Sequence, residues 1–547
     1  MRKYAEAARS GRRIGTGAAG AAVPRARWME LACGLASFIL VWWLWGSLRA
    51  VAVNHDEAAF LLQAQIFASA KLVAPSPPLP DFFQQWHVLV RPVLAAKYPP
   101  GYSLILVPGV WLGMPGLMPA LMASIGAALV FAIARDLTNT RVALLAVVLS
   151  ATSPITLRFS ASYFSEVADA FLWLCAWFAL HRHWKSGRRR WLLILAFVVG
   201  WGGITRPLSM LAFALPAGVA ALFSIRRHRA WHDVPAALAT AIAVTAIFPY
   251  WNGKVTGNWT KSAYAEYARQ YIPADRIGFG VDTEAPKDSS SADVLAFDRA
   301  VRAGHRDHIL ANLPRIAAAR AGAILQASWA IGAFAVVLIL PASVVIPVGV
   351  MRLLLGTLVV SFGAYLLYAH PPAWTLYYLE FQAPLAFLTA SGVYGLAEYA
   401  SRIGAQTHRA PLASARHLRS AVLVLCSAAL IVPALSHVPA YRAQNAAQRV
   451  WYEQFERAVR ALPDGRSIVF VRHAPVHDVN FSVVRNVPDR DRAAAWIVHD
   501  RGAEDTSLVK FGGDRAPYLY HEWRLGGRTY WRIDPMDIGA IVSRTVP

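Results

Sequence analysis

Long apolar segments recur along the first four-fifths of this 547-residue chain. Each is about 20 residues long, the length that an α-helix needs to cross the hydrocarbon core of a bilayer. Hydrophobic residues make up 56% of the chain and charged residues only 16%, whereas globular domains carry roughly 25% charged residues. This pattern excludes an ordinary soluble domain. Hydropathy windows predict about eleven transmembrane helices, the first beginning near Leu31 and the last near Ala421.

Lysine and arginine gather in a few connections between the apolar segments. The strongly basic stretches are residues 1–15, 181–191, 224–232 and 401–419. Because cytoplasmic loops carry an excess of Lys and Arg, we expect these stretches and the amino terminus to be cytoplasmic. The loops 49–116 and 252–320, and everything after His437, are then extracytoplasmic. The sequence thus predicts a multi-pass protein of the inner (plasma) membrane.

The net charge of +22 does not by itself indicate a nucleic-acid partner. The basic residues lie next to predicted membrane spans, where they suit anionic lipid headgroups. No nucleic-acid-binding motif accompanies them, so we expect no nucleic-acid partner.

Three parts are predicted along the chain. Residues 1–30 form a basic cytoplasmic tail, residues 31–438 the membrane region with its two outer loops, and residues 439–547 a small α/β domain. The last part has helical "QRVWYEQFERAVRALPDG", strand-like "SIVFVRH" and "AAWIVHD", and a hairpin pattern around Gly526 and Gly527. The predicted fold class is mainly α, a polytopic helical bundle with this small extracytoplasmic domain.

Two adjacent carboxylates, Asp56 and Glu57, follow the first apolar segment. Residues 58–72 after them have helical spacing but are too short and too polar to span, which predicts an amphipathic helix on the outer surface. The two acids are candidates for chemistry, and the alternative is a solvated pair or a helix cap.

Cations and further acids stand at other outer ends of the predicted spans. Lys97 and Tyr98 precede a Pro-Pro-Gly turn, and Arg206 lies in "TRP"; the alternative for both cations is interfacial snorkelling. Glu166 and Asp169 share one helical face; for Asp169, inside the predicted span, the alternative is an ion pair with Arg158 or Arg206.

A third group opens the predicted span near Leu376. Tyr377 and Tyr378 are candidates for contact with substrate, and the alternative is that they belong to the aromatic belt at the membrane surface. Glu380 lies inside the apolar run and is a further candidate for contact with substrate. His370 has no His or Asp cluster around it in sequence, so we expect a histidine that faces water rather than a metal ligand.

Several motifs occur in order between Leu31 and Ala400: the acidic pair, "KYPPGYSLIL", "SASYFSE", "GGITRP", "WNGKVTGN" and "LYYLEFQAPLAFL". In this order the chain resembles the polytopic membrane glycosyltransferases of the GT-C type, in the bacterial branch related to protein O-mannosyltransferases and aminoarabinose transferases. The resemblance implies transfer of a sugar from a polyprenyl-phosphate donor to an acceptor hydroxyl on the outer face. The acceptor is an envelope glycolipid, a polysaccharide or a protein.

The resemblance also implies roles for the candidate residues. Asp56 is then the catalytic base with Glu57 as its neighbour, and inversion at the anomeric carbon follows from direct displacement. The donor phosphate is met by Lys97, Tyr98 and Arg206, and Lys97→Ala is expected to weaken donor use while leaving the protein folded. Substrate contacts are expected from Glu166, Asp169, Tyr377, Tyr378 and Glu380. A monophosphate donor can be handled without a metal, and the sequence leaves open whether a divalent metal takes part.

The main alternative is a transporter or flippase of lipid-linked sugars. Such proteins often show repeated halves and polar breaks near mid-span, whereas this chain has no visible internal repeat and carries its ionisable residues at outer ends. A structural membrane subunit whose tail binds a partner is a further alternative, but it would not explain acids and cations that converge on one face.

Overall fold

The computed structural model describes residues 19–281, 283–286, 291–329, 332–406, 412–474, 482–526 and 528–537. It is mainly helical with small sheets, which confirms the predicted fold class. Within the described residues, six helices are long and apolar enough to cross a membrane. They are Arg27–Trp45, Leu117–Leu137, Pro207–His228, Trp231–Thr256, Val348–Tyr365 and an apolar window in Ala415–Arg460.

The remaining predicted spans form helices that are shorter or more polar. α6 (Thr140–Thr152) and α9 (Arg189–Gly203) have only 13 and 15 residues. α8 (Ser165–Ser186) has 22 residues but carries two acids near its start and a basic last turn. The number of eleven spans therefore stays a prediction.

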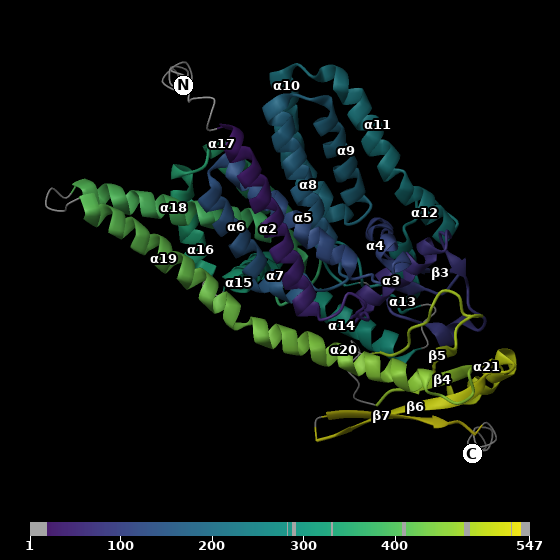
Figure 1. Ribbon diagram of the computed structural model, residues 1–547. Helices are drawn as coiled ribbons and strands as arrows, with labels where there is room; N and C mark the ends of the chain where they lie inside the picture. Colours follow the sequence, from purple (N-terminus) through teal and green to yellow (C-terminus); the bar gives the residue numbers. More distant parts are fainter. Residues whose placement is uncertain are drawn as a thin grey trace.

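The helices pack around a core of large apolar side chains. α5 (Leu117–Leu137) contacts α2 (Ala19–Trp45), α6 and α8, while α10 (Pro207–His228) lies against α17 (Val348–Tyr365). Trp173 and Phe213 are buried at the centre, with ring centroids 4.9 Å apart. α18 (Gln382–Gln406) closes the bundle against α6 and α19 (Leu412–Ser436), as Figure 1 shows.

Two of the basic connections, residues 181–191 and 224–232, lie together at one end of the molecule. The carbonyl oxygen of Trp184 accepts a hydrogen bond from His228 Nε2 at 2.9 Å. Lys185 pairs with Asp136 at 2.9 Å, and Arg135 pairs with Glu30 at 2.6 Å near the start of the first span. The C-terminal sheet lies at the opposite end (Figure 1).

Residues 49–116, predicted to be the first outer loop, form a compact layer at that opposite end. It contains α3 (His55–Ala68), a three-stranded sheet of order β1-β3-β2, and α4 (Gly101–Trp111). The strands are β1 (Ala74–Pro75), β2 (Val88–Leu89) and β3 (Val93–Ala96). The prediction that α3 lies on the outer surface was wrong: ten of its fourteen residues are buried. Apolar residues occur on more than one side of this helix, so packing covers it on several faces.

Gly101 allows this layer to contact the membrane helices closely. Its N–H donates to the Ile204 carbonyl oxygen at 2.8 Å. A Cβ at this position would lie 2.4 Å from Thr205 Oγ1 and 2.7 Å from Ile204 O, closer than any side chain tolerates. The Pro-Pro-Gly turn after Lys97 is therefore held against the segment that carries Arg206.

The described part of residues 252–320, predicted to be the second outer loop, packs against this layer. It supplies the end of α12 (Ile247–Thr256), then α13 (Ala263–Tyr271) and α14 (Ala292–Asp307). Tyr267 and Tyr271 on α13 and Val294 on α14 are buried in one cluster with Leu89 and Ala95 of the small sheet.

The C-terminal part begins with α20 (Val438–Arg460), which continues the line of α19 (Figure 1). A four-stranded sheet of order β5-β4-β6-β7 follows. β4 (Ser467–Arg472) pairs in parallel with β5 (Ala495–His499) and β6 (Ala516–Leu525), and α21 (Asp505–Gly512) connects them. β6 and β7 (Arg528–Pro535) pair antiparallel with Leu525 opposite Arg528, which confirms the predicted hairpin.

We expect the two ends of the molecule to lie on opposite sides of the membrane. A cysteine replacing the exposed Ser507 of α21, in a protein whose three native cysteines are changed to alanine, should react with an impermeant maleimide on intact cells. A cysteine replacing Lys185, in a basic connection at the other end, should react only after lysis. The reverse pattern would invert the predicted topology.

Candidate active site

The first turn of α3 directs its two acids to different places. Glu57 is buried, and its Oε2 accepts hydrogen bonds from the backbone N–H groups of Val53 and Asn54 at 2.7 and 3.1 Å. Its Oε1 accepts the N–H of Tyr163 at 3.0 Å. Burial raises the pKa of Glu57, while these three N–H groups act to lower it. Glu57 is therefore a buried cap at the start of α3, which was one of the alternatives that the sequence offered, and not part of a solvated pair.

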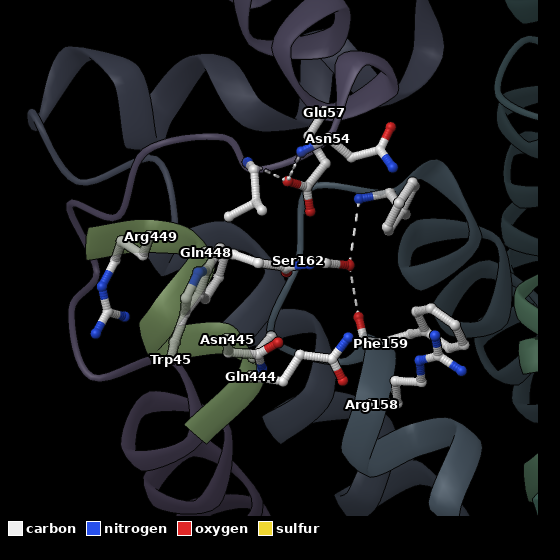
Figure 2. A pocket seen from close by; sticks show the side chains of 13 residues that line it. Trp45, Asn54, Glu57, Arg158, Phe159, Ser162, Gln444, Asn445, Gln448 and Arg449 are labelled. Atoms are coloured by element: carbon white, nitrogen blue, oxygen red, sulfur yellow. Dashed lines mark hydrogen bonds between the residues drawn. The ribbon is translucent and has the colours of Figure 1, made fainter. Parts of the chain in front are cut away.

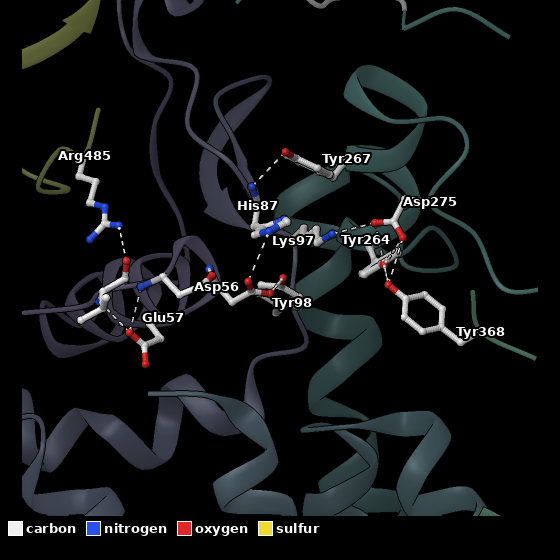
Figure 3. Close-up of polar contacts among 12 residues, drawn as sticks. Asp56, Glu57, His87, Lys97, Tyr98, Tyr264, Tyr267, Asp275, Tyr368 and Arg485 are labelled. Atoms are coloured by element: carbon white, nitrogen blue, oxygen red, sulfur yellow. Dashed lines mark hydrogen bonds and ion pairs between the residues drawn. The ribbon is translucent and has the colours of Figure 1, made fainter. Parts of the chain in front are cut away.

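Asp56 points the other way and keeps contact with solvent. Its side chain is 34% exposed. The Tyr98 hydroxyl donates a hydrogen bond to Oδ1, and His87 Nε2 lies 3.6 Å from Oδ2 (Figure 3). Burial and the charge of Asp56 raise the pKa of Tyr98 well above its usual value, so the phenol stays a donor. The carboxylate thus accepts the Tyr98 hydrogen bond, has the His87 imidazole close by and stays partly open to solvent.

His87 is a site residue that the sequence analysis missed. It is buried, and its φ of +62° places it in the left-handed region, where non-glycine residues are uncommon. Its N–H donates to Tyr267 Oη at 3.0 Å, and its carbonyl oxygen accepts from the Lys97 N–H at 2.8 Å. Burial and the nearby Lys97 charge hold the pKa of His87 well below its usual value, so the ring is neutral near pH 7. A lone histidine between Trp86 and Val88 carries no motif from which this placement could be predicted.

Lys97 is a buried ion-pair partner. Its side chain is 3% exposed, and Nζ lies 2.9 Å from Oδ2 of Asp275, which is 7% exposed. The Tyr264 hydroxyl lies 2.8 Å from both Asp275 oxygens, and its ring centroid lies 4.3 Å from Nζ. Burial would raise the pKa of Asp275, but the Lys97 charge and these hydrogen bonds lower it. That Lys97→Ala leaves the protein folded stays a prediction; this pair indicates that the substitution also lowers stability, because Asp275 would stay buried without its counter-charge.

The Arg206 guanidinium contacts Glu166 and Ser165 at the start of α8. One guanidinium nitrogen lies 2.8 Å from Glu166 Oε1 and donates to Ser165 Oγ at 3.1 Å. The other donates to the Tyr365 hydroxyl at 3.3 Å, and the guanidinium carbon lies 5.5 Å from the Tyr377 ring centroid. Glu166 is thus an ion-pair partner of Arg206.

Two further acids lie next to Arg206. Asp169 and Glu380 are both buried and share the Ser209 hydroxyl, which lies 3.1 Å from Glu380 Oε1 and donates to Asp169 Oδ2. The Tyr365 hydroxyl donates to Glu380 at 3.0 Å. These side chains form one connected polar cluster inside the bundle.

The aromatic residues near Leu376 face the protein interior. Tyr378, in η5 (Thr375–Phe381), is 0% exposed, and its hydroxyl lies 3.1 Å from His370 Nε2. Tyr378 is therefore not part of an aromatic belt, and the expectation that His370 faces water is wrong. Both residues are buried because residues 370–381 fold back over the Arg206 cluster. Tyr377 is partly exposed and stacks near Arg206. Among the described residues no group of three His, Cys, Asp or Glu side chains could hold a metal ion.

Comparison with known proteins assigns the fold. The family model described as dolichyl-phosphate-mannose-protein mannosyltransferase matches residues 116–252, a region that does not include Asp56 or Lys97. The crystal structure of ArnT from Cupriavidus metallidurans bound to undecaprenyl phosphate has 12% sequence identity, a TM-score of 0.51, and covers 91% of this chain and 97% of its own. No curated protein matches the sequence.

A second solved structure is more distant. The Archaeoglobus fulgidus oligosaccharyltransferase tethered with an acceptor peptide has 13% identity and a TM-score of 0.47, and covers 91% of this chain and 69% of its own. The predicted resemblance to GT-C glycosyltransferases is confirmed at the level of the fold by the first structure.

The buried pair yields a stability prediction. Lys97→Met should lower the free energy of unfolding by about 3–5 kcal/mol, because it leaves the buried Asp275 carboxylate without a counter-charge. Lys97→Met combined with Asp275→Leu should recover most of this loss, and Lys71→Met, at an exposed position, should have little effect. Thermal melting in detergent measures all three. A double variant that melts no higher than Lys97→Met would contradict the pairing.

Proposed function

We propose that this chain, which has the fold of the GT-C glycosyltransferases, is a membrane enzyme that transfers a sugar from a polyprenyl-phosphate donor to an acceptor hydroxyl. The reaction takes place on the outer face and inverts the anomeric centre. The observation that carries the proposal is Asp56: a partly exposed carboxylate, oriented by Tyr98 and His87, in a layer that also holds Lys97 and adjoins Arg206. The bound undecaprenyl phosphate named for ArnT supports the donor class.

The chemistry follows from these positions. The Asp56 carboxylate takes the proton of the acceptor hydroxyl as that oxygen attacks the anomeric carbon. The bond from this carbon to the phosphate oxygen breaks, and the polyprenyl phosphate leaves with the electron pair. Attack from the side opposite the leaving group inverts the configuration. The phosphate gains negative charge, which fixed cations stabilise.

Both candidate cations already have carboxylate partners. Lys97 pairs with Asp275, and Arg206 pairs with Glu166. A donor phosphate that reaches either cation takes a position next to, or in place of, the internal carboxylate. We infer that these acids hold the cations in place until the donor arrives.

The site favours a transferase over a flippase of lipid-linked sugars. Both would need cations for a lipid phosphate. Only a transferase needs a carboxylate that two neighbours orient while one side stays open, as they do at Asp56.

The two acids should respond differently to amide substitution. Asp56→Asn keeps the side-chain shape but loses basicity, so kcat should fall by about a hundredfold or more with little change in melting temperature. Glu57→Gln should destabilise the protein by about 1–3 kcal/mol, because an amide NH₂ cannot accept from backbone N–H groups, and should lower activity per folded molecule less than Asp56→Asn does. Sugar transfer and thermal melting of purified variants in nanodiscs measure both. Near-normal transfer by Asp56→Asn would remove the base from this position.

His87 should act through Asp56. We expect His87→Phe to lower kcat by between tenfold and a hundredfold with little change in KM, because loss of the imidazole lets the carboxylate turn from its productive direction. In an Asp56→Asn background the same substitution should cost almost nothing further, since the two residues act as a unit. Equal fold losses in both backgrounds would show that His87 serves only packing.

A further inference from the structure

Backbone hydrogen-bonding groups of β7 point toward an open edge of the C-terminal sheet. In the part of the chain that the structure describes, β7 is the last strand of the order β5-β4-β6-β7. The N–H of Met536 donates to the carbonyl oxygen of Pro517 at 3.0 Å, at the next position in the register of β6 and β7. In an antiparallel pair, residues that bond to the neighbouring strand alternate with residues that point away from it. The N–H and C=O groups of Thr529, Trp531 and Ile533 therefore face the edge.

This edge is long and accessible. β7 has eight residues, whereas the mean strand has about five or six. Four of its side chains are exposed, those of Arg528, Thr529, Tyr530 and Arg532. An exposed edge strand with free N–H and C=O groups is a template for pairing with a further strand. The end of the sheet at β7 can therefore accept another strand without rearrangement of the fold.

The sequence of β7 is complementary to itself when two copies run antiparallel. Centred on Trp531, the pairing places Arg528 of one copy opposite Asp534 of the other, and Tyr530 opposite Arg532. Opposite charges across two strands stabilise a sheet, and a guanidinium is attracted to the face of a tyrosine ring. Within one copy Arg532 Nε already lies 2.6 Å from Asp534 Oδ2. In the pair this carboxylate lies between two guanidinium groups, one from each copy.

Neighbouring registers of the same pairing lose a match. Moving the centre to Tyr530 or to Arg532 places an arginine opposite an arginine, and like charges directly across destabilise a sheet. Moving the centre to Ile533 places Trp531 opposite Pro535, which has no N–H to donate. The register centred on Trp531 keeps opposite charges across from each other and lets the edge-facing residues exchange both N–H···O bonds.

The position of the sheet suits a pairing of two copies in one membrane. Tyr520 of β6 and Trp531 of β7 pack on Phe455 of α20, with ring centroids 5.5 and 6.0 Å from that of Phe455. Figure 1 shows α20 between this hairpin and the membrane helices. The two-fold axis of an antiparallel strand pair runs perpendicular to the sheet, so here it points toward the membrane helices. Two copies related by this axis have the same orientation in the bilayer.

We propose that β7 is a self-association surface, through which two copies of this chain form a symmetric dimer. Their two four-stranded sheets then join into one continuous sheet. Strand addition at a sheet edge takes its affinity from main-chain hydrogen bonds and its specificity from side chains, and the side chains of β7 match those of a second β7. The proposal does not depend on the reaction that the membrane region performs.

Disulfide cross-linking of the full chain in native membranes tests the register, in a protein whose three native cysteines are changed to alanine. Arg528→Cys combined with Asp534→Cys should form a covalent dimer under mild oxidation. The two positions face each other as a non-hydrogen-bonded pair, with Cα atoms about 4.5 Å apart, within reach of a disulfide. Arg528→Cys combined with Arg532→Cys should stay monomeric, because neither cysteine faces another in this register. Absence of a dimer from the first pair, or equal cross-linking of both pairs, overturns the proposal.

Charge reversal tests the same contact without cysteines, with the mass of the purified full chain in detergent measured by light scattering over a range of concentrations. Asp534→Arg should weaken the dimer about tenfold or more, because it places like charges opposite each other. Adding Arg528→Asp should restore the dimer, since the two charges are then exchanged. Asp514→Arg, at an exposed acid away from β7, should leave the dimer unchanged. A wild type that stays monomeric, a dimer that Asp534→Arg does not weaken, or an exchange that restores nothing overturns the proposal.

Discussion

Three backbone N–H groups on the buried Glu57 carboxylate fix the direction in which Asp56 points. Neighbouring residues on a helix lie about 100° apart, so a Glu57 held toward Tyr163 leaves Asp56 on the side of Tyr98 and His87. Arg485 of the C-terminal part adds to this constraint. Its guanidinium donates to the carbonyl oxygens of Ala52 and Val53, which precede α3. The segment between β4 and β5 thereby helps to hold the candidate base.

Charge compensation explains the rest of the site. A buried cation without a partner is costly, and the two strongest candidates for phosphate binding meet that cost with internal acids, Asp275 and Glu166. Under the proposed function, donor binding exchanges one anion for another near each cation. The polar clusters then serve two purposes, since they stabilise the protein without substrate and place its cations for the lipid phosphate.

Much of this could be predicted from the sequence, for identifiable reasons. Apolar length predicts helices whatever their neighbours, and alternation with a Gly-Gly turn predicts the hairpin of β6 and β7. The order of motifs from Asp56 to Glu380 indicated a fold that the comparison with ArnT confirms. Local pattern carries such information because each feature depends on residues close together in the chain.

What escaped prediction depends on long-range packing. α3 is covered mainly by α4 and β3 of its own segment, and also by Tyr163 and Val167 at the start of α8, about 100 residues further along the chain. Asp275 pairs with Lys97 across 178 residues, and neither residue signals the other. The strained backbone of His87 has no sequence signature. A pocket beside the first turn of α3 likewise reaches α20 (Figure 2), and no local pattern connects the two helices.

The central claim is that the chain moves a sugar from a lipid phosphate to an acceptor rather than across the membrane. Mass spectrometry of envelope extracts from cells with and without the gene tests this most directly, when combined with leaflet-specific labelling of the lipid-linked sugar. The account predicts that one acceptor loses a sugar unit and that the polyprenyl-phosphate-linked sugar accumulates on the outer leaflet. An unchanged envelope, or accumulation confined to the cytoplasmic leaflet, would contradict it.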